Sequence, residues 1–261
     1  MISVSIITIG NEIVKGRTVN TNASEIAQAF TKVGFRVVRH TSIPDECDVI
    51  AETLSDSFRT YDITITTGGL GPTFDDITVE CFSKGIGKKL VLNTEAEQII
   101  RDKYQTLKLP LTQERLKMAY FPEGSRIIRN NVGTAPGLFL TVDSHKIFGL
   151  PGVPREMRDM LPEVISLCGK SGLAYKSIEF EIEGIMESEI APFVKTIMKK
   201  YENTIYIKTH PVSDELTYPK LIVELYSIAE ANIDFTPSME DIKASIKKWG
   251  TEKKESSKKK S

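Results

Sequence analysis

Residues 62–78, DITITTGGLGPTFDDIT, contain a β-branched run, three glycines and two adjacent aspartates. The run Asp62–Thr67 predicts a strand, and the spacing of apolar residues over Asp76–Lys84 predicts a helix. The glycines between them allow backbone N–H groups to approach an anion, and the start of a helix adds roughly half a positive charge directed at it. This strand–turn–helix unit therefore indicates an α/β fold with a phosphate-binding loop.

Two further strand–helix units precede this stretch. Strand patterns at Val4–Ile9 and Arg36–Ser42 are followed by helical patterns at Thr21–Lys32 and Asp45–Arg59. Alternation of this kind predicts a parallel sheet with helices on both faces, and sheets of this class bind ligands at the carboxyl ends of their strands. We therefore expect functional residues in the loops that follow the first three strands.

The remainder of the chain predicts the end of this domain and a second, smaller one. Helical patterns at Thr94–Leu107 and Val153–Cys168 flank a hairpin signal over 137–150, and a Gly-Lys-Ser-Gly break follows at 169–172. Strand and helix patterns then restart and finish in a helix over Ser238–Trp249. We expect a first domain over 1–170, a small α+β module over 171–249 and a disordered, lysine-rich tail over 250–261.

The composition is that of a soluble globular protein. Of 261 residues, 40% are hydrophobic and 26% are charged, and no apolar run approaches the roughly 18 residues that a membrane span needs. Met1 leads directly into a strand pattern, without the basic start of a signal peptide. We therefore expect a cytoplasmic protein with no membrane partner.

The chain has three cysteines, Cys47, Cys81 and Cys168, which lie far apart and form no Cys-x-x-Cys pair. This spacing predicts neither a disulfide framework nor a zinc–thiolate site, and we expect all three to be small core residues. The histidines show no ligand spacing, so a bound metal would have to be held by carboxylates. We also expect no haem or flavin site.

Lysines gather after residue 243 and make the end of the chain basic, although the net charge of the whole chain is −1. Charged runs at chain ends are commonly solvated and frayed. We therefore expect no nucleic-acid partner.

Asp75 and Asp76 follow the glycine loop at the place where a helix cap is expected, and capping would account for one of them. A second carboxylate beside a bound phosphate would repel it unless a divalent cation lay between them. We therefore expect a Mg²⁺-like ion at Asp76.

The loops after the first two strands offer more polar groups. Asn11 and Glu12 follow the first strand, where they are placed to bond a ribose or base and to face a metal. Asp45 follows the second strand and is either the cap of the next helix or another carboxylate of the crevice. The sequence leaves both interpretations of Asp45 open.

Two later turn-rich stretches, 130–137 and 150–157, are either structural or part of the same site. Their small residues permit close backbone approach to a ligand, and Gly152 before a helix start is a second potential anion site. The residues expected to bind phosphate or substrate are Gly68, Gly69, Gly71, Thr73, Asn11, Gly133, Thr134 and Gly152.

Taken together, these loops resemble the competence/damage-inducible protein A (CinA) family. The motifs that carry the resemblance are Gly10-Asn11-Glu12, Asn20-Thr21-Asn22, Thr67–Thr73 with Asp75–Thr78, Gly133–Gly137, and Leu150–Pro154 with Glu156-Met157. The likeness covers 1–170 as a MoaB/MogA-like molybdopterin-binding domain and continues to about 249 as the small module that follows it. We expect the chain to lack the C-terminal domain that deamidates nicotinamide mononucleotide in longer members.

The resemblance implies a three-layer α/β/α fold with a nucleotide or pterin phosphate in the glycine loop. For the CinA branch it implies metal-dependent hydrolysis of ADP-ribose to AMP and ribose 5-phosphate. In the related molybdopterin adenylyltransferases, functionally important aspartates follow the glycine loop and the second strand, and they correspond to Asp76 and Asp45. Those enzymes usually carry Gly-Gly-Thr-Gly, whereas Leu70 makes the loop Gly-Gly-Leu-Gly here.

Our leading hypothesis is therefore a hydrolase of nucleotide pyrophosphates. Asp45 and Asp76 would be catalytic and, together with Glu12, would hold Mg²⁺ or Co²⁺, with K⁺ as an accompanying ion. Molybdopterin adenylylation and non-catalytic nucleotide binding are the alternatives. The expected partners are a nucleotide or pterin phosphate and a second copy of the chain in a homodimer.

Overall fold

The computed structural model describes residues 1–202, 204–212, 219–229 and 233–258, with side chains as far as 250. The chain divides into two compact units, Met1–Ser171 and Gly172–Ser261. Each unit has its own hydrophobic core. The helices of the described residues do not combine the length and apolarity that a membrane crossing requires.

The first unit is built on a mixed six-stranded sheet in the order β2-β1-β3-β8-β7-β6. Four of its strands are parallel: β1 (Ser3–Ile9), β2 (Arg36–Ile43), β3 (Ile63–Thr67) and β8 (His145–Leu150). The other two, β7 (Gly137–Val142) and β6 (Arg126–Ile128), are antiparallel to their neighbours. The expected βαβαβ opening and the hairpin after it are thus confirmed.

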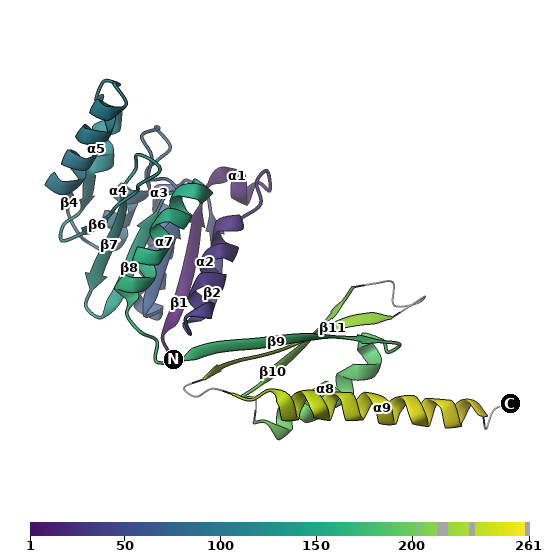
Figure 1. Cartoon of the computed structure of the whole chain (residues 1–261). Helices are drawn as coiled ribbons and strands as arrows, with labels where there is room; N and C mark the ends of the chain where they lie inside the picture. Colours follow the sequence, from purple (N-terminus) through teal and green to yellow (C-terminus); the bar gives the residue numbers. More distant parts are fainter. Residues whose placement is uncertain (203, 213–218, 230–232, 259–261) are drawn as a thin grey trace. The chain divides into compact units, whose positions relative to one another are not determined.

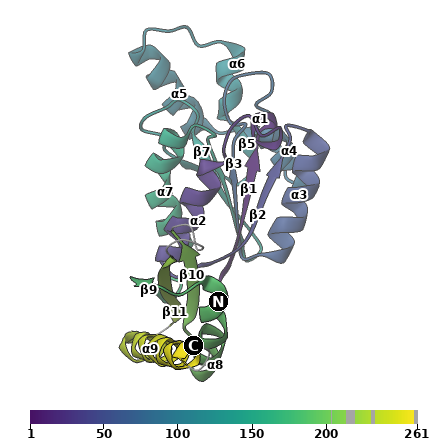
Figure 2. The ribbon, with the colours of Figure 1, turned by 90° about the vertical axis from the view of Figure 1, so that its right-hand side faces the viewer.

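Helices cover both faces of this sheet, as the ribbon shows from two sides (Figures 1 and 2). On one face lie α2 (Thr21–Lys32) and α7 (Pro154–Cys168). On the other lie α3 (Cys47–Thr60), α4 (Thr78–Gly85) and α5 (Thr94–Thr106). The expected three-layer α/β/α architecture is confirmed.

The alternation of side chains along the strands supplies the two cores. Val4 and Ile6 of β1 face α2 and α7, where they pack against Phe30. Ile7 and Ile9 face the opposite way and join the cluster formed by α3, α4 and α5. Because both faces are covered, the first strands read as nearly continuous apolar and β-branched runs.

The short helix that the sequence predicts to start at Thr112 is α6 (Gln113–Leu116), and Thr112 is its N-cap. Four other short elements were not predicted: α1 (Asn11–Val14), β4 (Leu90–Leu92), the 3₁₀ turn η1 (Lys117–Ala119) and β5 (Tyr120–Pro122), which pairs with β4. Elements of three or four residues are too short to show a periodicity, so tertiary contacts rather than local pattern define them.

The second unit is a three-stranded antiparallel sheet in the order β10-β11-β9, with two helices. Its strands are β9 (Ala174–Glu183), β10 (Tyr206–Pro211) and β11 (Lys220–Ala229), and its helices are α8 (Glu187–Lys200) and α9 (Thr236–Lys258). The small α+β module is thus confirmed as a fold class. The helix expected to end at Trp249 continues to Lys258, so most of the segment expected to be disordered is helical.

The expectation for the cysteines is wrong for two of them. Cys47 and Cys81 form a disulfide, with their Cα atoms 5.1 Å apart, while Cys168 is a buried free thiol. The partners are 34 residues apart in sequence and sit on different helices. No spacing motif reveals such a pair, because only the packing of α3 against α4 brings the two side chains together.

Candidate functional site

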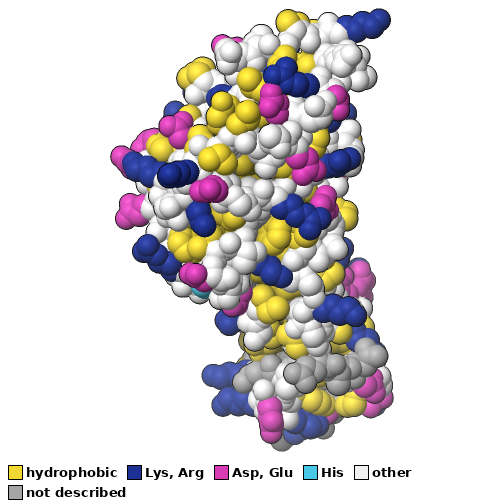
Figure 3. All heavy atoms as spheres, turned by 90° about the vertical axis from the view of Figure 1, so that its left-hand side faces the viewer, with side chains coloured by type: hydrophobic (Ala, Val, Ile, Leu, Met, Phe, Trp, Pro, Cys, Tyr) yellow, Lys and Arg dark blue, Asp and Glu magenta, His cyan; other side chains and the backbone are white. Residues whose placement is uncertain are grey.

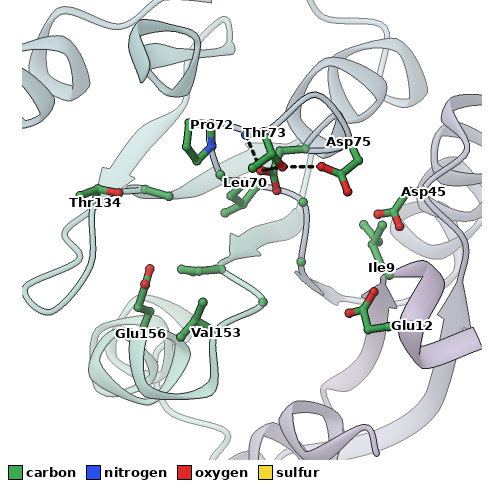
Figure 4. Close-up of a pocket in the computed structure, with 18 residues that line it drawn as sticks. Ile9, Glu12, Asp45, Leu70, Pro72, Thr73, Asp75, Thr134, Val153 and Glu156 are labelled. Atoms are coloured by element: carbon green, nitrogen blue, oxygen red, sulfur yellow. Dashed lines mark hydrogen bonds between the residues drawn. The ribbon is translucent and has the colours of Figure 1, made fainter. Parts of the chain in front are cut away.

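A cavity of about 500 Å³ lies where the parallel strands of the first unit end (Figure 4). Its walls come from the loops after β1, β2, β3 and β8, together with the 130–137 loop. Of the residues predicted from the sequence, those that line it are Glu12, Asp45, Gly68, Gly69, Gly71, Thr73, Asp76, Thr134 and Gly152. Asn11 and Gly133 lie next to lining residues but do not line the cavity themselves.

The glycine loop has a backbone that side chains would not permit. Gly68 has φ +111°, and a Cβ there would lie 2.1 Å from the carbonyl oxygen of Ile9. Gly69 has φ +67°, and a Cβ there would lie 2.1 Å from Oγ1 of Thr78. Both positions therefore require glycine on two grounds, the left-handed backbone and the close approach of neighbouring segments.

Not every N–H group of the glycine loop is available to bind an anion. The N–H of Gly68 donates to the carbonyl of Leu150 at 3.0 Å, which ties the loop to the end of β8. The N–H groups of Gly69, Leu70 and Gly71 have no acceptor among the described residues. Because Gly69, Leu70 and Gly71 line the cavity, these three N–H groups are the candidates for binding an anion there, whereas the N–H of Gly68 is already used.

Asp76 folds back on the loop that precedes it. Its carboxylate accepts the N–H of Thr73 at 2.8 Å and the hydroxyl of Thr73 at 2.6 Å. The same hydroxyl contacts Asp75, and this contact holds the pKa of Asp75 below its usual value. The interpretation of these aspartates as helix caps is wrong, because the N-cap of α4 is Ile77 and α4 has no side-chain cap.

Asp45 joins the loops that follow β1 and β2. Its Oδ2 accepts the N–H of Asn11 at 2.7 Å, so the backbone of Asn11 is occupied within the protein. The capping interpretation of Asp45 is also wrong, because the N-cap of α3 is Glu46 and no side chain caps this helix. Burial raises the pKa of Asp45, and the negative charges of nearby Glu12, Asp75 and Asp76 raise it further against the effect of the Asn11 hydrogen bond.

Asn22 fixes the neighbouring loop in place. Its Nδ2 donates to Thr67 Oγ1 and to the carbonyl of Gly152, both at 2.9 Å, and the Thr67 hydroxyl donates to the carbonyl of Pro151 at 2.8 Å. Asn20 caps α2 by accepting the N–H of Ala23 at 3.1 Å. Asn22 therefore explains why the 150–153 turn stands against the glycine loop, a role that its place in the Asn20-Thr21-Asn22 motif did not predict.

Glu156 lines the cavity; the sequence placed it in the 150–157 stretch without assigning it a role. It stands in the first turn of α7, and its Oε2 accepts Nδ2 of Asn130 at 2.6 Å. A Cβ at Gly133 would lie 2.1 Å from Cδ of Glu156. Gly133, which is expected to bind phosphate, therefore lies against the end of the Glu156 side chain, and its N–H donates to Asn130 Oδ1 at 2.6 Å.

The carboxylates allow a test of the expected metal. In the part of the chain that the structure describes, no three His, Cys, Asp or Glu side chains are arranged to hold a metal ion by themselves. Mg²⁺ in proteins commonly takes one or two carboxylates together with substrate phosphates and water. Asp45 and Asp76, which line the same cavity as Glu12, fit an ion that arrives with a phosphate and do not fit a preformed protein cage.

Comparison with known proteins places this geometry in a family. The model of the family described as "Probable molybdopterin binding domain" matches residues 5–169, which contain the entire cavity. The chain belongs to this family. A protein of Metallosphaera sedula is 48% identical over 223 residues, covering 84% of this chain and 83% of that protein. One of Saccharolobus solfataricus is 43% identical over 241 residues, covering 91% and 88%.

Among solved structures, this family member is similar to the protein CinA from Thermoplasma acidophilum. The identity is 45% and the TM-score 0.60, and the match covers 63% of this chain and 97% of that one. That structure is described as having unknown function, and the names of the two sequence relatives state no activity. The expected resemblance to CinA and to molybdopterin-binding domains is confirmed, whereas the roles of the individual site residues stay predictions.

Proposed function

We propose that the protein hydrolyses nucleotide pyrophosphates in a metal-dependent reaction, with ADP-ribose as the favoured substrate and AMP and ribose 5-phosphate as products. The observation that carries this proposal is the placement of two kinds of group in one cavity. Three free backbone N–H groups at Gly69–Gly71 stand beside the carboxylates Asp45 and Asp76. The negative oxygens of a pyrophosphate can accept hydrogen bonds from the N–H groups. A cation is needed where these oxygens approach the carboxylates.

The three N–H groups would bind the phosphate oxygens and stabilise the charge that grows on them as water attacks phosphorus. Because Asp76 holds the backbone of Thr73, it keeps this loop in shape before substrate binds. The bridging P–O bond breaks, and the elements of water are shared between the two phosphomonoester products. Asp45, which is fixed by the N–H of Asn11, would help to orient that water through the divalent ion that it holds with Asp76.

Asp45, Asp76 and Glu12 would hold Mg²⁺ or Co²⁺, with K⁺ as an accompanying ion. When bound, the divalent ion would supply charge neutralisation at the phosphates and activation of water. We further infer a cytoplasmic protein that acts as a homodimer on small molecules. Basic and acidic side chains are interspersed over the face drawn in Figure 3, so this face presents no continuous basic patch of the kind that binds nucleic acid.

Molybdopterin adenylylation is the second candidate, and the description of the family favours it. In that reaction the same N–H groups would hold the phosphates of ATP, and the pterin phosphate would attack the α-phosphorus with release of pyrophosphate. A non-catalytic nucleotide-binding module is the third. Release of pyrophosphate from Mg-ATP only when molybdopterin is added would establish the second candidate, and nucleotide binding without turnover of either substrate would establish the third.

The test of the proposal is a ³¹P NMR time course of the full chain with ADP-ribose, Mg²⁺ or Co²⁺, and K⁺. We expect two phosphomonoester signals to appear only with the divalent ion, and Asp76→Asn to slow them about 100-fold or more. Asp56→Asn is the matched control, because Asp56 lies on α3 in an exposed ion pair with Arg39. An unchanged pyrophosphate spectrum at high protein concentration would exclude ADP-ribose as the substrate.

A further inference from the structure

Glu156 and Thr134 form a polar wall of the cavity that the proposed hydrolysis does not use. In Figure 4 the Glu156 carboxylate extends from the start of α7 towards Thr134, across the cavity from Glu12 and Asp45. The glycine loop lies between the two sides. The pyrophosphate position is thus flanked by carboxylates at both ends, and only one end is accounted for by a metal.

Neighbouring residues hold the Glu156 side chain in its position. Asn130, whose exposed fraction is 2%, donates from Nδ2 to Glu156 at 2.6 Å and to the carbonyl of Ala135 at 2.9 Å. The Lys103 amine contacts the carbonyls of Asn130 and Gly133 and holds the same loop from the side of α5. The hydrogen bond from Asn130 therefore orients the carboxylate, which lies close to Gly133 of the same loop.

A structural role at the helix start does not explain this arrangement. An acidic residue three positions after the N-cap commonly reaches back to the N-cap N–H in a capping box. Here the N-cap is Val153, which has no polar side chain, and Glu156 points to Asn130 instead. Its second oxygen, Oε1, and the hydroxyl of Thr134 make no hydrogen bond to the described residues.

The chemistry of this wall selects what can lie against it. A carboxylate repels the phosphate oxygens that the glycine loop attracts, and it accepts hydrogen bonds strongly from neutral hydroxyls. A carboxylate that faces a nucleotide cleft is also the usual partner of ribose hydroxyls. Beside it, the Thr134 hydroxyl can donate or accept. The complementary group is therefore a sugar diol attached to the phosphate.

We propose that Glu156 and Thr134 form a subsite for the hydroxyls of a sugar that is esterified to the bound pyrophosphate, so that Glu156 determines specificity for sugar-bearing pyrophosphates. This inference rests on the proposed function for the location of the pyrophosphate. It extends that function by naming the residue that lets the site distinguish a sugar nucleotide from pyrophosphate alone.

The experiment measures Kd by calorimetry for ADP-ribose, ADP and pyrophosphate with Ca²⁺ in place of Mg²⁺, so that the ligands bind without the proposed hydrolysis, using this chain and Glu156→Gln. The substitution keeps the size of the side chain and removes its charge. We expect the substitution to weaken the binding of ADP-ribose about ten- to hundred-fold, which corresponds to the usual contribution of a hydrogen bond to a charged group. The binding of pyrophosphate should be unchanged or tighter. Glu163→Gln, on the outer face of the same helix and paired with Arg126, is the control.

The outcomes separate this inference from the proposed function. A loss of affinity that is confined to the sugar-bearing ligands supports the inference. A change in the Kd of ADP would show that the sugar bound by Glu156 is the ribose of the adenosine. An equal change for pyrophosphate and ADP-ribose, or no change for either, would overturn it. Since Kd is measured without turnover, failure of hydrolysis in the wild-type chain would contradict the proposed function and leave this comparison valid. Melting curves of both variants confirm that any loss is not unfolding.

Discussion

The disulfide between Cys47 and Cys81 joins the first residue of α3 to α4. Asp45 stands two residues before Cys47, and Thr78, which follows Asp76 and Ile77, begins the helix that contains Cys81. The covalent bond therefore links the two segments that carry the carboxylates of the proposed site. Their separation across the cavity is set by this bond as well as by the sheet.

Removal of this bond should destabilise the protein. Closing a loop of 34 residues restricts the unfolded chain, which contributes about 3–4 kcal/mol in the chain-entropy model. We expect the variant Cys47→Ala/Cys81→Ala to lose a free energy of unfolding of this size in urea denaturation. Wild-type protein in excess dithiothreitol is the internal control and should show a similar loss. Equal stability of oxidised and reduced wild-type protein would contradict the disulfide.

The thiol of Cys168 should be unreactive in the folded protein. Burial raises its pKa to about 12, so at pH 8 almost no thiolate exists to react. A chromogenic disulfide reagent should therefore detect no thiol in native, non-reduced protein and one thiol after denaturation. Reduction before denaturation should bring the count to three, the number of cysteines in the chain. Rapid labelling of Cys168 in the native state would show that the helix α7 is not packed as described.

Asp45→Asn should abolish turnover while stabilising the fold at neutral pH. The folded state raises the pKa of Asp45, so ionisation of this group costs folding free energy as the pH rises through the folded pKa. The amide cannot ionise but can still accept the N–H of Asn11. We expect a higher melting temperature than wild type at pH 7, with the difference vanishing below pH 3.8, where Asp45 is protonated in both states.

The matching activity measurement is the rate of ADP-ribose hydrolysis, which should fall about 100-fold or more. A variant that is less stable than wild type at pH 7 would show that the Asn11 hydrogen bond outweighs the burial of the charge.

Gly69→Ala and Gly87→Ala provide a paired test of the glycine loop. Both glycines have φ +67°, so alanine costs about 1–2 kcal/mol at either position for the left-handed backbone. At Gly87 a Cβ meets open space, whereas at Gly69 it would lie 2.1 Å from Thr78 Oγ1. We expect Gly69→Ala to be more destabilising by a further 1–3 kcal/mol, roughly, and to lose Mg-pyrophosphate binding. An equal loss of stability in the two variants would show that the glycine loop can move away from a Cβ at position 69 at no further cost.

Much of the site could be predicted from the sequence because its parts have local signatures. The three glycines and two aspartates after a β-branched run identify the loop, and the order of the strands places the other loops at the same edge of a sheet. The capping interpretation of Asp45 and Asp76 failed for a physical reason. Asp45 accepts the N–H of Asn11 at the start of α1, and Asp76 accepts the N–H of Thr73 in the glycine loop, so neither binds the helix that follows it. A local pattern cannot distinguish such a partner from a cap.

The contacts that were not predicted share one property. Glu156 is held by Asn130, and Asn22 holds Gly152, 130 residues further along the chain. Cys47 and Cys81 likewise meet only after two helices have packed. None of these contacts leaves a periodicity or a spacing in the sequence.

By itself, the sequence determined the α/β class, the parallel opening of the sheet and the loop that faces an anion, because these depend on side-chain alternation, helical spacing and glycine, which act over a few residues. The tertiary structure alone decided which N–H groups of that loop remain free, which carboxylates face each other across the cavity and which cysteines bond. Those are distances between segments far apart in the chain, and only the packing of helices on both faces of the sheet sets them.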